Sequence, residues 1–254
     1  MPARFLIFFF QLLLLAFQFL PVHGKTDTRP GGGEPKARGD MVSETQLALS
    51  DAAEWLGDWH PLAEQLGSAD GLLALGSVSA SLRLSPVRDL RSLRAFLRQY
   101  QRQLLFPVEL PSIQAAHGHT ARKELRELVA LDRQLCEEPR LRDFAGASRR
   151  VGSSQLQKLR PLRDQRMVQR YLQAVSTGAA QGWHTLVYGL TLEVYSLPLR
   201  QGLLGYAHQT TRGFLYSASR SLGLSERQCR ALFDELGAEL PQAIEDLLRQ
   251  PIAA

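Results

Sequence analysis

Histidine is the side chain of this sequence best suited to metal chemistry, and His117-Gly118-His119 brings two imidazoles within three residues. Such a pair could supply two ligands to a metal ion. The pair follows Pro111 in a segment that we expect to be a loop, where alternating histidines are more often exposed turn residues. His184 and His208 lie in apolar stretches, which favours core or interface histidines over ligands. We therefore predict no metal site.

Cysteine chemistry is limited to Cys136 and Cys229, and neither has another cysteine or a histidine cluster at metal-site spacing. This usage is typical of reduced thiols in a cytosolic protein, and it disfavours a disulfide framework. The sequence also has no Gly-rich phosphate loop, no Gly-x-Ser-x-Gly elbow and no His-Glu-x-x-His motif. We predict a protein that is not an enzyme and needs no cofactor. An enzyme with an unrecognised site stays open, and it would require titratable groups clustered in a pocket.

The composition suits one globular domain or two small ones, with 254 residues, 44% of them hydrophobic and 22% charged. The net charge of +5 would permit an acidic partner. Most basic residues alternate with carboxylates, as in residues 122–127, which indicates a solvated helix face. No dense basic run with interleaved aromatics occurs, so nucleic-acid binding is not predicted.

The amino terminus resembles a secretory signal peptide. An apolar run from Phe5 to Leu20 follows Arg4, and Val22-His23-Gly24 offers small residues for cleavage. The run is too short to favour a membrane span, which needs roughly 20 apolar residues. Residues 25–40 then form a linker rich in glycine, proline and charge. Residues 1–40 are therefore either a signal and linker or an extension upstream of the true start.

Met41 opens a segment with the features of a natural beginning. Ser43-Glu44-Thr45-Gln46 has capping-box spacing ahead of apolar residues at helical intervals. We expect an all-helical domain over residues 41–254, because alternating strand patterns bounded by turn pairs are absent.

Apolar residues recur at three- and four-residue steps along the rest of the chain. A long amphipathic helix is expected from a Ser85-Pro86 cap through Leu104, and a second over Leu125 to Leu135. The apolar stretch from Pro198 to Gly223 should be a buried central helix, and Ser225 to Gln228 is another capping box. Further helices are expected at 140–159, 167–177, 183–195 and from Pro241 onward.

Four segments of the chain share their order and spacing with a known family. They are Arg88 to Leu97, Leu128 to Leu135, Ala147-Ser148-Arg149-Arg150-Val151-Gly152, and Gly182 to Gly189. Together they resemble the helical signatures of the urease accessory protein UreF family, over about Trp55 to the carboxyl terminus.

The resemblance implies an all-helical scaffold that loads nickel into urease. In that family the protein dimerises, binds UreD (also called UreH) and recruits the GTPase UreG to the urease apoprotein. It implies a cytoplasmic homodimer, which favours the start at Met41. As the composition and the short apolar run indicate, we expect neither a nucleic-acid partner nor a stable membrane span. The alternative is a secreted or membrane-anchored helical interaction module, which a genuine signal peptide would favour.

Residues of two kinds are the candidates for partner binding. Small residues such as Ala147, Ser148 and Gly152 would let a neighbouring helix approach closely, which serves packing at least as well as partner contact. Arg149 and Arg150 are either a solvated surface pair or an electrostatic contact with an acidic partner, and Arg227 and Arg230 are the better candidates for the GTPase side. The predicted partner-binding residues are Arg149, Arg150, Arg227, Arg230, Trp183 and His184.

Overall fold

The computed structural model describes residues 87–250, and every regular element in that stretch is helical. The prediction of a single all-α domain is thereby confirmed. Residues 1–40, the start at Met41, the Ser43 capping box and the Ser85-Pro86 cap lie outside the described residues. In chain order the elements are α5 (Leu90–Tyr100), η1 (Gln101–Glu109), α6 (Leu110–Ala121), α7 (Leu125–Glu137), η2 (Pro139–Phe144), α8 (Ala145–Lys158), α9 (Arg166–Ser176), α10 (His184–Val194), α11 (Leu199–Leu222), α12 (Glu226–Gly237) and α13 (Leu240–Arg249).

The first helix runs on past its predicted end at Leu104. It begins at Leu90, where the Asp89 carboxylate accepts the Ser92 amide at 2.7 Å and the Ser92 hydroxyl accepts the Asp89 amide at 3.0 Å. After α5 the chain continues without a break through η1, a π-helical segment that contains Pro107, into α6. Proline has no amide hydrogen and interrupts the backbone ladder, and a π-helical turn is one way to accommodate such an interruption.

His117 and His119 lie within α6, so the predicted exposed turn is wrong. Pro111 is the second residue of α6, and the helical run of α5, η1 and α6 continues through it. The segment after Pro111 is therefore helix, where we expected a loop. His119 is only 6% exposed, and His117 is half-buried.

The remaining helices agree closely with the sequence pattern. The Ser225 capping box forms as predicted, with Ser225 Oγ accepting the Gln228 amide at 3.3 Å. Pro241 lies in the first turn of α13. The segment predicted at 140–159 departs in one respect, because its first residues belong to the 3₁₀ turn η2 and the α-helix begins only at Ala145.

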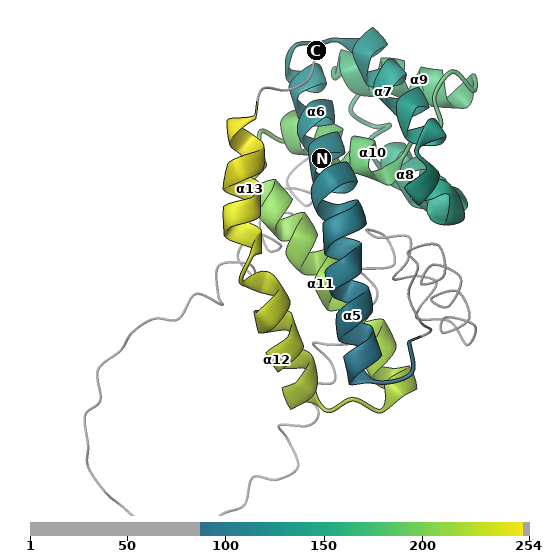
Figure 1. Ribbon diagram of the computed structural model, residues 1–254. Coiled ribbons are helices and arrows are strands. Elements are labelled where there is room, and N and C mark those ends of the chain that lie inside the picture. Colours follow the sequence, from purple (N-terminus) through teal and green to yellow (C-terminus); the bar gives the residue numbers. More distant parts are fainter. Residues whose placement is uncertain (1–86, 251–254) are drawn as a thin grey trace, which may run out of the picture. The chain divides into compact units, whose positions relative to one another are not determined.

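Two groups of helices accompany the continuous run of α5, η1 and α6. Figure 1 shows α7, α8, α9 and α10 gathered near α6, while α11 and α12 lie beside α5. Helix α13 lies nearer α6, where Gln114 Nε2 donates to the Leu247 carbonyl at 3.5 Å. The predicted central helix is confirmed, since Leu203, Tyr206 and Phe214 of α11 are at most 1% exposed. Phe214 also packs edge-on against Tyr100 of α5, with ring centroids 4.9 Å apart.

None of the helices that the structure describes is both long enough and apolar enough to cross a membrane.

Candidate functional site

Asp132 of α7 organises the loop that leads into α10. Its carboxylate is fully buried and accepts three hydrogen bonds: from the Gln181 amide at 2.6 Å, the Gly182 amide at 2.9 Å and the Tyr171 hydroxyl at 2.6 Å. A buried carboxylate is tolerated when donors of this kind replace its lost water. Burial and the neighbouring carboxylate raise the pKa of Tyr171 well above its usual value, so its hydroxyl stays a donor. Asp132 thus fixes the backbone of residues 181–184, which we call the α10 junction.

On its other side, the α10 junction is held by a chain of buried polar side chains. Ser148 Oγ of α8 lies 2.7 Å from His184 Nδ1, and His184 Nε2 lies 2.7 Å from the Tyr206 hydroxyl of α11. Tyr206 donates in turn to Glu109 Oε2 at 3.2 Å, and Tyr100 donates to the same oxygen. With Ser148 as donor to Nδ1, the order of donors and acceptors is consistent for a neutral imidazole that carries its proton on Nε2.

Burial, reinforced by the Glu109 carboxylate, raises the pKa of both Tyr100 and Tyr206 well above the usual value. Both tyrosine hydroxyls therefore stay protonated over the physiological range, and the chain joins α5, η1, α8, α10 and α11 through hydrogen bonds. A crevice lined by Glu109, Ser148 and His184, among others, leaves no room for a water molecule. The polar chain is packed interior, and it does not open onto a cavity that could admit a substrate.

Two glycines allow α8 and α6 to pack against the α10 region with their backbones in direct contact. A methyl group at Gly152 of α8 would stand 2.0 Å from the Gly182 carbonyl oxygen and 2.8 Å from the His184 nitrogen. A methyl group at Gly189 of α10 would stand 2.5 Å from the Ile113 carbonyl oxygen of α6. Real Cβ atoms do not come this close to backbone, so only glycine permits these approaches.

Three of the four sequence segments therefore meet at the α10 junction, and the fourth, Arg88 to Leu97, lies on α5. A UreF family model matches residues 87–237, which cover all four segments and more than half of the chain. The chain belongs to the UreF family. A comparison with curated proteins gave no match. Within the UreF match, the signature residues Asp132, Ser148 and His184 are buried in the interior of the helical domain.

The structure divides the six predicted partner-binding residues into two groups. Trp183 and His184 are 2% and 5% exposed, and both belong to the α10 junction, where His184 joins the polar chain and Trp183 Nε1 donates to Cys136 Sγ at 3.4 Å. Their side chains are not available to a docked protein in this structure, because packing against α8 covers them. The exposed candidates are Arg149, Arg150, Arg227 and Arg230.

Arg149 has a defined geometry at the surface beside the α10 junction. Its Nη1 donates to Gln181 Oε1 at 2.7 Å and its Nε to the Ala145 carbonyl at 3.1 Å. Arg227 and Arg230 lie on the first turns of α12, next to the Ser225 capping box. The arginine pairs on α8 and α12 thus present cationic groups from well-anchored helices.

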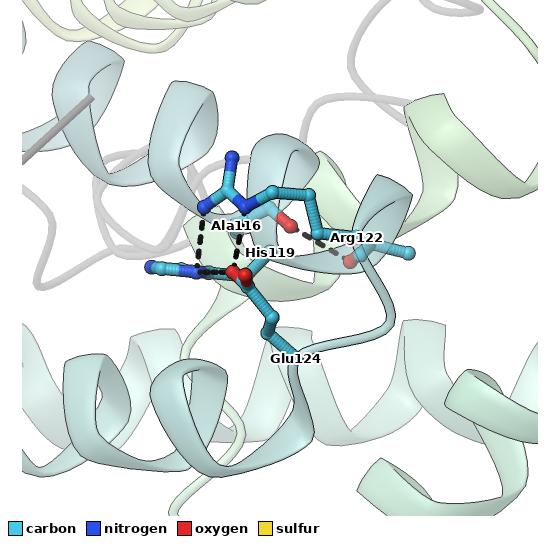
Figure 2. A network of polar contacts seen from close by, with 5 residues as sticks. Ala116, His119, Arg122 and Glu124 are labelled. Carbon is cyan, nitrogen blue, oxygen red and sulfur yellow. Dashed lines mark hydrogen bonds and ion pairs between the residues drawn. The ribbon is translucent and has the colours of Figure 1, made fainter. Parts of the chain in front are cut away.

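The two histidines of α6 serve separate contacts. His117 Nε2 pairs with Glu193 of α10 at 3.1 Å, while His119 Nδ1 lies 2.9 Å from Glu124 and 3.1 Å from Arg122 Nη2. Figure 2 shows the second group, in which Arg122 Nε also donates to Glu124. Because residues two apart on a helix point to different sides, the pair does not chelate one ion. Within residues 87–250, no group of three or more His, Cys, Asp or Glu side chains is placed to hold a metal.

Sequence reasoning missed Asp132, Glu109 and Tyr206 as the residues that organise this region. One signal for Asp132 was available: it stands four residues after Leu128, on the apolar stripe of its helix, where a solvated carboxylate is out of place. Glu109 likewise follows directly on buried Val108 and precedes buried Leu110. Apart from Tyr100, which is nine residues from Glu109, their partners lie tens of residues away along the chain, and no local pattern predicts such pairs.

Proposed function

We propose that this chain is an accessory protein of urease maturation, a scaffold that joins UreD (UreH) and the GTPase UreG to the urease apoprotein for nickel insertion. The observation that supports it most directly is the UreF match over residues 87–237. The interior supports it as well, because the signature residues build a rigid helical domain and the described part of the chain offers charged surfaces for partners. We propose no catalytic role and no resident cofactor, with nickel as cargo of the assembly.

The partner contacts that we propose are electrostatic. Arg149 and Arg150 on α8, and Arg227 and Arg230 on α12, would face acidic surfaces of the other accessory proteins. Trp183 and His184 would act indirectly, by holding the backbone of the α10 junction beside Arg149. The active form that we propose is a cytoplasmic homodimer of residues 41–254, translated from Met41, with residues 1–40 outside the functional domain.

The test is affinity capture of the full chain, tagged at its carboxyl terminus and expressed in its native organism under conditions that produce active urease. Mass spectrometry identifies the bound proteins and the amino terminus of the captured chain. Recovery of UreD and UreG with a chain that begins at Met41 is the expected result. Their absence from cells with active urease would contradict the scaffold function, and a chain that begins at Lys25 outside the cytoplasm would contradict the start and the location.

A further inference from the structure

The positive charge of this protein is concentrated in one short stretch. Residues 149–170, on α8, α9 and their connection, contain seven basic residues and one acidic residue, a net of +6. The whole chain carries only +5, so the remaining residues are close to neutral. Four arginines at the α9 end of this stretch, which we call the α8–α9 basic surface, are all exposed: Arg160, Arg163, Arg166 and Arg170.

Local structure holds these four arginines together. Arg166 and Arg170 are one turn apart on α9, so they share a face, while Met167, Val168 and Tyr171 on the opposite side are buried. Gln169 Nε2 donates to the Arg160 carbonyl at 3.1 Å and to the Leu162 carbonyl at 3.0 Å. These bonds tie the connection to α9 and bring residues 160–163 close to the helix that carries the other two arginines.

The chain does not neutralise this surface within the described residues. Two carboxylates of α12 and α13 pair with arginines of other helices, Glu235 with Arg94 and Arg98, and Glu245 with Arg200. No ion pair within residues 87–250 involves an arginine of the α8–α9 basic surface.

Arg166 is the first residue of α9, a position where a positive charge is unfavourable for the helix. The amino-terminal end of a helix carries partial positive charge and is stabilised by acidic side chains, yet the first turn of α9 has none and its N-cap Gln165 makes no side-chain cap bond. An external carboxylate would meet both the guanidinium groups and the free amides of that end. We therefore expect this end of α9 to be more stable with an anionic group bound to it than without one.

We propose that the α8–α9 basic surface docks an acidic face of a partner protein in the urease maturation assembly, an inference that rests on the proposed function. A protein fits better than a nucleic acid or a membrane. Exposed residues from 158 to 177 include no aromatic side chain for stacking on bases and no large apolar one for insertion into lipid. Asp164, in the middle of the surface, would repel phosphate but can pair with a basic residue at the edge of an acidic protein face.

The experiment measures binding of the purified full chain to purified UreD and UreG from the same organism, at several salt concentrations. The variant Arg166→Glu/Arg170→Glu is compared with wild type and with Arg91→Glu/Arg102→Glu, which makes the same change in net charge at exposed arginines of α5 and η1. We expect the α9 variant to bind at least about tenfold more weakly and with a shallower salt dependence, and the control to bind as wild type does. The melting temperature of the α9 variant should equal or exceed that of wild type, because Arg166→Glu places a carboxylate in the first turn of α9.

Each outcome decides a different question. Equal binding by the α9 variant and wild type overturns the docking surface and leaves the scaffold function intact. Equal loss in both charge variants overturns it too, because net charge alone would then explain binding. Failure of wild type to bind either protein overturns the scaffold function, and the docking surface with it. Circular dichroism of the α9 variant confirms that any loss arises in a folded protein.

Discussion

Gly152 of α8 lies against the carbonyl of Gly182, so close that a methyl group on residue 152 would stand 2.0 Å from that oxygen. The contact joins two signature segments that are thirty residues apart in sequence, and no side chain intervenes. The α10 junction is therefore clamped on one side by backbone and on the other by the Asp132 carboxylate.

Gly152→Ala should strongly destabilise the protein. The added methyl group meets backbone atoms, which cannot move without displacing α8 from the α10 junction, and we expect a loss of about 3 kcal/mol or more in the free energy of unfolding. Gly146→Ala on the same helix is the control: no atom lies within 4 Å of its added methyl group. That variant should be neutral or more stable by up to about 1 kcal/mol, as measured by urea denaturation. Similar stabilities for the two variants would contradict the close approach.

Asp132→Asn should also destabilise the domain. One acceptor oxygen becomes an amino group that faces an existing donor, so at least one buried hydrogen bond is lost and a repulsive contact takes its place. We expect a loss of roughly 2–4 kcal/mol, measured by thermal unfolding. Asp143→Asn on an exposed residue of η2 should change little. A wild-type melting temperature for Asp132→Asn would show that the carboxylate does not hold the loop.

His184 and Tyr206 should be energetically coupled through their 2.7 Å contact. His184→Gln and Tyr206→Phe each break the same buried chain, so the double variant should lose less stability than the two single losses combined. A double-mutant cycle should give a coupling of about 1 kcal/mol or more. Strict additivity would mean that the polar chain is a set of independent contacts.

Acid should weaken the fold partly through His208. Burial, together with nearby Arg212, lowers the pKa of His208 below its ordinary value of 6.5. The unfolded chain therefore takes up a proton at higher pH than the folded protein does. The free energy of unfolding should be at its full value above pH 6.5 and fall as the pH drops toward the lowered pKa. In urea titrations at pH 7.5, 6.5 and 5.5, the free energy of unfolding should fall less with decreasing pH for His208→Gln than for wild type. An equal fall in the two proteins would exclude His208 as the source of the acid sensitivity.

Arg227→Glu/Arg230→Glu tests the proposed contact with the GTPase. Both arginines are exposed on α12, so the double variant should fold normally and lose binding to UreG. Arg91→Glu/Arg102→Glu again serves as the control of equal charge. Retained UreG binding by the α12 variant would remove these two residues from the proposed interface.

The sequence predicted the helices well because each leaves a local signal. The Ser225 capping box and the Pro241 helix start needed only neighbouring residues, and both form as expected. The loop expected around His117 was wrong because the helical run continues through Pro111, and a proline within a helix and a proline beyond its end look alike in sequence. The α10 junction could not be foreseen, since Asp132 meets Gly182 across 50 residues and only tertiary packing brings them together.

That separation has a consequence for how the protein is made. The ribosome synthesises Asp132 well before the two amides that will donate hydrogen bonds to its carboxylate, at residues 181 and 182. Until Gly182 has left the exit tunnel, burial of α7 would strand an ion in the interior, so its final docking must wait. The docking of α7 therefore comes late in translation, once residues 181 and 182 can reach the Asp132 carboxylate.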